Sequence, residues 1–367
     1  MRIAAFVFCV LLQGLFAAAA AAQEIPFKLY GNMILLPVEV NGVKTIGRID
    51  TGGQVSLVHP SFAAQLGLRK GDKMIASGIS NKMRSYDTIA PVDLKLGDKV
   101  YRTDRLLALA MRSMAARGDE GIGIIIGMDV LEDMVTEIDF DRMVIRFTPA
   151  DQFKPPTAIA PVKIQRFHGQ LYLPGEITGT KSVHITFDTG DTDAALFTEY
   201  LARTALKGQP LSQVMIGGVD GLTPHQIGSL PQLTVAGVTF ENVPTRVAPG
   251  MSESIGIGLE VLKRFNLVMD FRHNNMWMTP NSNAKLPFDR DLVGIQSLAD
   301  EWPGELLFVA PGSPAAKAGM KAGDVIRNIT DDMGEPVDDF SALEVGSHLT
   351  ILMGDGSTRE LVAQRYY

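Results

Sequence analysis

The stretches Ile49-Asp50-Thr51-Gly52 and Phe187-Asp188-Thr189-Gly190 decide the fold, because one triplet occurs twice, each time after an apolar residue. The segments before them are also alike. Leu36 to Lys44 reads LPVEVNGVK, and Leu173 to Lys181 reads LPGEITGTK. A short triplet is weak evidence when it stands alone, but a repeated triplet inside a repeated context indicates an internal duplication.

Two further likenesses follow downstream of the triplets. Ile124 to Leu131 reads IIIGMDVL and matches Ile255 to Leu262, which reads IGIGLEVL. In the same ungapped register, Asp139-Phe140 matches Asp270-Phe271. Landmarks that recur in one order along the chain predict a duplicated domain rather than a chance resemblance.

Each repeat is predicted to consist mostly of β-strands. Met33 to Val40 and Val43 to Ile49 are apolar or β-branched runs around Asn41-Gly42, the preferred pair for a two-residue hairpin. Thr178-Gly179 takes that place in the second repeat. Short helices are expected after the triplets, at Ser61 to Leu66 and at Thr198 to Arg203. Short strands with glycine-rich turns favour closed or partly closed barrels.

Proline-rich and polar segments divide the chain. Lys154-Pro155-Pro156 separates the two repeats, and the polar run from Pro280 to Lys285 ends the second one. The predicted organisation is a signal peptide at residues 1–22, a first lobe at 23–150, a second lobe at 151–285, and a small domain at 286–367. We refer to the last three as lobe 1, lobe 2 and the C-terminal unit.

The first 22 residues have the features of a secretory signal. Met1-Arg2 is followed by an apolar run from Ile3 to Phe16 and by the alanines Ala17 to Ala22, which suit cleavage before Gln23. We therefore expect an exported protein, periplasmic or secreted, with no membrane span after signal cleavage. An N-terminal membrane anchor is the alternative. The only cysteine, Cys9, lies in this segment, so cysteine chemistry is not expected in the mature chain.

Composition narrows the classes of partner. The chain has 367 residues, of which 46% are hydrophobic and 20% are charged, as in an ordinary globular protein. The net charge of −7 disfavours nucleic acid as a partner. The six histidines show no paired spacing for a metal. We predict no metal site and no cofactor.

The paired triplets, together with Ile126-Gly127 and Ile257-Gly258 downstream, resemble the retropepsin-like aspartic proteases of bacteria, which belong to the pepsin superfamily. In that family each half contributes one triplet loop, and a later hydrophobic-hydrophobic-glycine strand supports it. The resemblance covers residues 25 to 280. It implies a mainly β fold with two acid-protease barrel lobes in tandem and the activity of an aspartic endopeptidase.

The resemblance also implies a role for each residue of the triplets. Asp50 and Asp188 would be the catalytic pair, which shares one proton because two adjacent carboxylates do not both ionise. Thr51 and Thr189 would hydrogen-bond across the pseudo-twofold axis. Gly52 and Gly190 would let backbone amides approach the carboxylates. A water molecule activated by the pair would attack the peptide bond.

Two other features bear on the site. The family's flaps are glycine-containing hairpins, for which the candidates are Gly78 and Ile79 in lobe 1 and Gly217 and Gly218 in lobe 2; surface loops explain these glycines equally well. Asp191 and Asp193 stand where small residues are usual after the triplet. If they face the pair, their charges raise its pKa. If they point outward, they have little effect.

The C-terminal unit resembles bacterial PDZ domains. Pro311 to Ile326 is similar to their helix-turn-strand signature, and Val293-Gly294-Ile295 stands where that family places its peptide-carboxylate loop. The resemblance implies capture of a C-terminal peptide ligand that adds a strand to the sheet. The alternative is a domain that only packs on the protease.

Three readings of the whole chain remain open. In the first, both repeats form one active site within a chain that acts on a peptide or protein substrate. In the second, a homodimer pairs each repeat with its counterpart in another chain, so the protein is a monomer or a homodimer. The third is a non-catalytic periplasmic peptide-binding protein on a degenerate protease scaffold.

Overall fold

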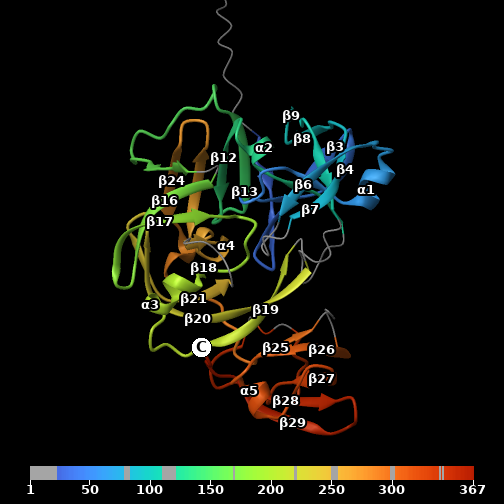
Figure 1. Cartoon of the computed structure of the whole chain (residues 1–367), viewed down its shortest axis with the longest axis vertical. Coiled ribbons are helices and arrows are strands. Elements are labelled where there is room, and N and C mark those ends of the chain that lie inside the picture. The colour runs from blue at the N-terminus through green and yellow to red at the C-terminus, as the bar shows by residue number, and fades with distance from the viewer. Residues whose placement is uncertain are drawn as a thin grey trace, which may run out of the picture.

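The computed structural model describes residues 23–77, 83–109, 121–167, 170–218, 221–248, 255–297, 302–338, 340 and 343–367. The predicted signal peptide and Cys9 lie outside the described residues, as do the flap candidates Gly78 and Ile79. Figure 1 shows the two lobes side by side and the C-terminal unit below them.

The hairpin predicted before the first triplet is confirmed. Strands β3 (Met33–Val40) and β4 (Val43–Ile49) pair in antiparallel fashion. Their turn has positive φ at both central residues, 48° at Asn41 and 80° at Gly42, as the Asn-Gly pair predicts. The counterpart in lobe 2 is formed by β16 (Gln170–Ile177) and β17 (Thr180–Phe187), joined through Gly179 at φ 77°.

Each lobe is built around one sheet, and the two sheets share a pairing pattern. In lobe 1, β11 (Ile122–Ile126) is parallel to β4 and antiparallel to β5 (Leu57–Val58). In lobe 2, β22 (Ile255–Ile257) is likewise parallel to β17 and antiparallel to β18 (Ala195–Thr198). The remaining strands of the lobe 1 sheet are β2 (Lys28–Tyr30), β6 (Lys70–Ser77), β7 (Met83–Ile89), β8 (Asp93–Leu96), β9 (Lys99–Arg102) and β10 (Leu106–Ala108).

The lobe 2 sheet closes on itself, as expected for a barrel. The long strand β20 (Gly221–Val235) pairs with β21 (Val238–Ala248) and also with β16, which joins the two sides of the sheet. Strand β19 (Ser212–Gly218) pairs with β20 as the edge strand, and β15 (Gln165–Phe167) pairs with β16. The fold is therefore mainly β, with two barrel-like lobes in tandem, as the sequence predicts.

A third sheet joins the lobes. Strand β12 (Met134–Asp139) of lobe 1 pairs antiparallel with β23 (Phe265–Asp270) of lobe 2. Glu137 lies opposite Val268, which is its counterpart in the register that matches Asp139 with Asp270. The local twofold axis relating the repeats therefore passes between these two residues. The other strands are β1 (Ile25–Pro26), β13 (Val144–Pro149), β14 (Val162–Lys163) and β24 (Asn275–Pro280).

Helices are short and follow the functional segments. Both predicted helices form, as α1 (Pro60–Gln65) and α3 (Glu199–Ala205), and the Thr198 hydroxyl caps α3 by accepting from the Leu201 amide. Strands β11 and β22, which lead into Gly127 and Gly258, are called the glycine strands below. Helices α2 (Met128–Leu131) and α4 (Leu259–Leu262) begin directly after them. The C-terminal part of the chain has a 3-10 turn, η2 (Ser282–Lys285), and α5 (Pro314–Lys317).

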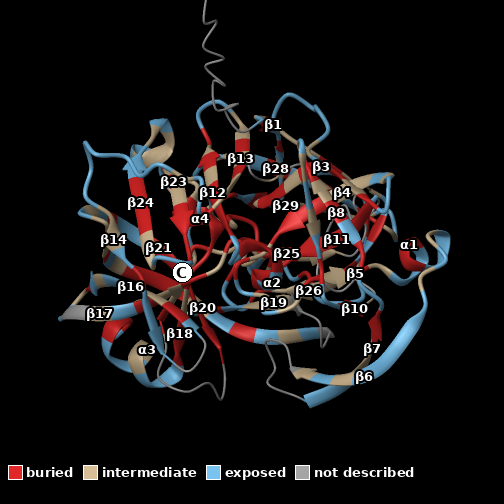
Figure 2. Cartoon of the chain, turned by 90° about the horizontal axis from the view of Figure 1, so that it is seen from above, coloured by how far each residue is buried: buried red, intermediate tan, exposed pale blue. Residues whose placement is uncertain are grey.

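One continuous hydrophobic core runs through both lobes, while a separate cluster fills the C-terminal unit. Figure 2 shows the buried residues concentrated along the strands of the lobes. Burial of apolar surface at roughly 25 cal/mol per Å² is the main source of stability. Because Phe187 stacks on Phe271 at 6.3 Å between ring centroids, the residue before the second triplet anchors its loop to this core.

The C-terminal unit is a separate antiparallel sheet whose edge strand faces lobe 2. Its strands, in sheet order, are β25 (Ile295–Ser297), β26 (Gly304–Val309), β27 (Val325–Thr330), β28 (His348–Met353) and β29 (Thr358–Val362). Helix α5 is capped by the Ser313 hydroxyl, which accepts from the Ala316 amide. In Figure 1, β19 lies between the rest of lobe 2 and β25.

Within the described part of the chain, helices are all too short or too polar to cross a lipid bilayer.

Candidate active site

The two Asp-Thr-Gly triplets meet within one chain. Each begins where a strand ends, β4 before Asp50 and β17 before Asp188. The Asp50 amide donates to the Ile126 carbonyl at 3.0 Å, and the Asp188 amide donates to the Ile257 carbonyl at 3.0 Å. The two glycine strands therefore hold the triplets in equivalent positions.

The threonines hydrogen-bond across the junction of the lobes. The Thr51 amide donates to Thr189 Oγ1 at 3.1 Å, and the Thr189 amide donates to Thr51 Oγ1 at 3.0 Å. Both side chains are buried. Each hydroxyl thus fixes the backbone of the opposite loop, which is the arrangement that the resemblance implies.

The glycines bring the two carboxyl groups face to face. A Cβ built on Gly52 would lie 2.2 Å from Asp188 Oδ2, and one built on Gly190 would lie 2.3 Å from Asp50 Cγ. The Gly52 amide donates to Asp50 Oδ1 at 3.0 Å and to Asp188 Oδ1 at 3.1 Å, so it bridges the pair. The Gly190 amide donates to Asp188 Oδ1 at 2.6 Å. The absence of a Cβ at Gly52 and Gly190 is what permits this approach.

The two carboxyl groups are electrostatically unequal. Burial raises the pKa of Asp188 well above its ordinary value, and the charges of Asp50 and Asp191 raise it further. Asp188 is therefore the member of the pair that keeps a proton. Each carboxyl group also accepts from two backbone amides, Asp50 from Gly52 and Gly53, and Asp188 from Gly52 and Gly190.

Asp191 and Asp193 are both partly buried, and both pair with a buried arginine. Arg246, on β21, lies 2.8 Å from Asp191 Oδ2 and 2.5 Å from Asp193 Oδ2. Its Nη1 atom also contacts His225 Nδ1 at 3.3 Å. Burial and the neighbouring Arg246 cation lower the pKa of His225 to about 4, so His225 is neutral near pH 7. The cation offsets the charge of the two carboxylates beside Asp188.

Sequence reasoning missed Arg246, whose partners all lie in lobe 2, and it also missed two side chains that join the lobes. Arg48 is buried and donates to the Gly190 carbonyl across the junction. Asn32 donates to the Thr192 carbonyl at 3.1 Å and to Glu260 Oε2 at 2.9 Å. Arg48 stands two residues before Asp50, which is the only local signal for it. Asn32 lies in an N-terminal turn with nothing in its neighbourhood that marks it.

The flap candidates of lobe 2 lie at a hairpin tip. Gly217 pairs with Leu222 and Gly218 pairs with Gly221, so the chain reverses between β19 and β20 directly after these glycines. They do not take part in the contacts around the two carboxyl groups that are described above.

In the predicted peptide-carboxylate loop, two backbone amides donate to an aspartate of the chain itself. The amides of Val293 and Gly294 donate to Asp291 Oδ1 at 2.9 and 2.7 Å. The Tyr366 hydroxyl donates to the other carboxylate oxygen of Asp291 at 2.8 Å. Ile295 begins β25, opposite Val309. A carboxylate of the chain itself thus takes the two amides that a peptide C-terminus would need.

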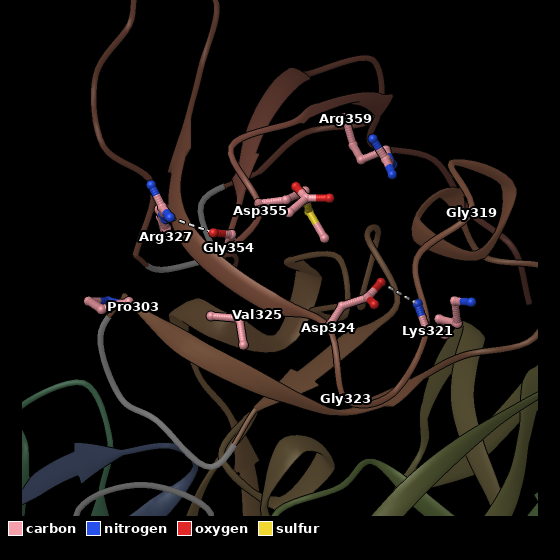
Figure 3. A pocket seen from close by; sticks show the side chains of 11 residues that line it. Pro303, Gly319, Lys321, Gly323, Asp324, Val325, Arg327, Gly354, Asp355 and Arg359 are labelled. Carbon is pink, nitrogen blue, oxygen red and sulfur yellow. Dashed lines mark hydrogen bonds between the residues drawn. The ribbon is translucent and has the colours of Figure 1, made fainter.

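A hollow on the C-terminal unit lies apart from the two carboxyl groups. Figure 3 shows that Asp324, Arg327, Asp355 and Arg359 line it, and all of its lining residues come from the C-terminal unit. In the stretches covered by the structure, we found no group of three or more histidine, aspartate or glutamate side chains placed to hold a metal ion.

Substitution of Gly52 by alanine is expected to destabilise the fold by about 1–3 kcal/mol, because the new Cβ has no space beside Asp188. Gly53→Ala is the matched control, since its Cβ would sit 3.6 Å from Asp50 Cγ, at ordinary contact distance. Denaturant unfolding of both variants measures the difference. Equal stability of the two variants would contradict the close approach described here.

A comparison with protein families agrees with this geometry. The profile of a family described as aspartyl protease matches residues 36–130 and 173–261, which together make up half of the chain. Both segments begin at the leucine that opens a repeat, and both include the triplet and the glycine strand. A search of curated proteins found no significant match. On the strength of this profile match and of the paired triplets, the chain belongs to the aspartyl protease family.

Proposed function

We propose that the protein is an exported aspartic endopeptidase whose active site is the pair Asp50 and Asp188 of a single chain. The observation that carries the proposal is the shared Gly52 amide, which donates to a carboxylate oxygen of each aspartate. Two carboxyl groups held this close share one proton, which provides an acid and a base at the same place.

The raised pKa of Asp188 indicates which aspartate acts as the acid and which acts as the base. Asp188 holds the proton because burial and the charges of Asp50 and Asp191 raise its pKa. A water molecule between the carboxyl groups transfers a proton to Asp50 as its oxygen attacks the peptide carbonyl. Asp188 donates its proton to the carbonyl oxygen, which gives a neutral tetrahedral diol. Asp50 then protonates the amide nitrogen as the C–N bond breaks, and a hydroxyl of the diol returns its proton to Asp188.

Asp191→Asn is expected to shift the pH profile of cleavage. Activity falls as the pH rises through the pKa of Asp188, because the proton on that group is lost. Asp191 raises this pKa, so its neutralisation lowers it and moves the alkaline limb to lower pH. Asp193→Asn is the control. Asp193 carries an equal charge and also pairs with Arg246, but it is not among the main causes of the raised pKa of Asp188. An equal shift in both variants would count against the direct effect of Asp191.

Cleavage of a peptide library by the purified mature chain tests the proposal. The products are identified by mass spectrometry between pH 3 and 8, with and without an inhibitor that carries a hydroxyl in place of the tetrahedral diol. Cleavage that the inhibitor blocks supports the endopeptidase. Binding of peptides without cleavage at any pH in this range would overturn it and favour the peptide-binding alternative.

Export rests on the N-terminal sequence, in which a basic start, an apolar run and a row of alanines precede Gln23. N-terminal sequencing of the protein recovered from a bacterial host tests this part. A mature chain that begins at Gln23 in the periplasmic or extracellular fraction supports export, and an uncleaved chain in the membrane fraction would favour an anchor.

A further inference from the structure

A glutamine of the C-terminal unit holds the main chain of the hairpin formed by β19 and β20. Gln296, on β25, accepts from the Met215 amide through Oε1 at 2.8 Å and donates to the Met215 carbonyl through Nε2 at 3.1 Å. A primary amide carries the same donor and acceptor as a peptide group. The Gln296 side chain therefore pairs with the backbone amide and carbonyl of Met215 in the way that a peptide group of a neighbouring strand would.

The register of the hairpin explains why Met215 is available to it. Met215 lies opposite Pro224 on β20, and the two residues form a pair that exchanges no backbone hydrogen bond, a position that proline tolerates because it has no N–H. The Met215 amide and carbonyl point away from β20, toward β25. Since β19 is the edge strand of the lobe 2 sheet, these groups would otherwise be an unpaired edge.

Further contacts fix the same two units to each other. The Ser212 hydroxyl, at the start of β19, donates to the Pro311 carbonyl at 2.7 Å, and the Ser212 side chain is buried. Arg290 donates to Ser229 Oγ on β20 at 2.7 Å and to the Asn242 carbonyl on β21. The base of the hairpin and the middle of β19 are thus both held by the C-terminal unit.

The hairpin extends beyond these contacts toward lobe 1. After Met215 the chain continues only to Gly218 before it turns back at Gly221. In Figures 1 and 2 strands β19 and β20 extend toward the side of lobe 1 that carries β6 and β7. The described contacts to the C-terminal unit lie behind this end of the hairpin, so they fix the direction in which the two strands extend.

We propose that the C-terminal unit positions the β19–β20 hairpin as the flap of lobe 2, with Gln296 as the positioning residue. The occupied carboxylate loop at Asp291 fits this role, because the unit binds a strand of its own chain at β25 and not a free peptide C-terminus at Val293 and Gly294. The proposal rests on the proposed function, since a flap has meaning only where a substrate is cleaved.

Gln296→Leu in the full mature chain tests the proposal. Leucine keeps most of the side-chain size but has neither donor nor acceptor. Hydrogen exchange of the peptides that cover 212–227 is expected to become about tenfold faster, because a satisfied edge amide is lost. The kcat/KM for a library peptide is expected to fall about tenfold, mainly through a higher KM. Thr350→Leu on β28 is the matched control, an exposed strand residue of the same unit, and is expected to change neither quantity.

Gln296→Glu is expected to recover on acidification, and a variant that simply fails to fold would not recover. Ionised glutamate still accepts from the Met215 amide, but it has no donor and repels the Met215 carbonyl, so at pH 7 this variant should lie between the wild type and Gln296→Leu. A protonated glutamic acid again has one donor and one acceptor, so below a pH of about 4 its exchange and kcat/KM should approach those of the wild type.

Three results would overturn the proposal. The first is hairpin exchange in Gln296→Leu that equals that of Thr350→Leu. The second is faster exchange with unchanged kcat/KM, and the third is no recovery of Gln296→Glu on acidification. If the wild type cleaves no peptide, the proposed function fails by itself, while the exchange measurements still decide whether Gln296 holds the hairpin.

Discussion

Asp50→Asn and Asp188→Asn, made one at a time, are each expected to reduce peptide cleavage by at least about 10³-fold. Asp50 receives the proton of the attacking water, and Asp188 supplies the proton for the carbonyl oxygen. Neither step has a substitute in the pair, so the two losses should be nearly equal. Initial rates on a fluorogenic library peptide measure them, with Asp98→Asn on the surface as a control of unchanged activity.

Stability separates a chemical loss from a folding loss in these variants. The pKa of Asp188 is raised in the folded state, so folding above the ordinary pKa of an aspartate is coupled to keeping a proton on this group. Asparagine removes that cost, and Asp188→Asn should be at least as stable as the wild type at pH 7. An inactive Asp188→Asn that also unfolds more easily would contradict this account.

The same two variants test the homodimer reading. If each repeat were paired with its counterpart in another chain, either substitution would leave one intact pair. Each variant would then keep roughly half of the activity, and the rate would depend on protein concentration. A complete loss in both variants at every concentration is the expected result for a pair within one chain.

Arg246→Met is expected to destabilise the protein by about 3–5 kcal/mol, because it leaves two carboxylates without their buried cation. Arg102→Met is the matched control. Arg102 lies 2.6 Å from Asp93, but both side chains are more than half exposed, so its loss should have an effect below about 1 kcal/mol. Urea unfolding at pH 7 measures both changes.

The triple variant Arg246→Met, Asp191→Asn, Asp193→Asn distinguishes the cause of that loss. If unpaired charge is responsible, neutralisation of both partners should recover most of the lost stability. If the arginine acts mainly through packing, the triple variant should be no more stable than Arg246→Met. The second outcome would contradict the explanation that pairing with Arg246 allows Asp191 and Asp193 to lie beside Asp188.

The features that the sequence predicts well are those set by local chemistry or by repetition. Asn41-Gly42 requires positive φ at both positions, so the hairpin around it follows with its bounds. The duplicated triplets and glycine strands predict the pairing of two loops, since equivalent segments take equivalent places.

The features that could not be predicted depend on long-range partners. Asp191 and Asp193 are visible in the sequence, but Arg246 lies some 55 residues away from Asp191 on a strand whose facing residues are not evident before folding. Asp291 is a different case. An aspartate two residues before Val293 is a local signal for a turn in which its carboxylate accepts the following amides, and it explains the loop.

The residues on the local twofold axis differ in charge between the two lobes. Glu137 faces Val268 inside the chain, whereas two copies of lobe 1 joined through β12 in the same register would set Glu137 against Glu137. Like charges directly opposite each other weaken a strand pair, and burial already raises the pKa of this glutamate. At this strand lobe 1 is therefore better matched to lobe 2 than to a second copy of itself.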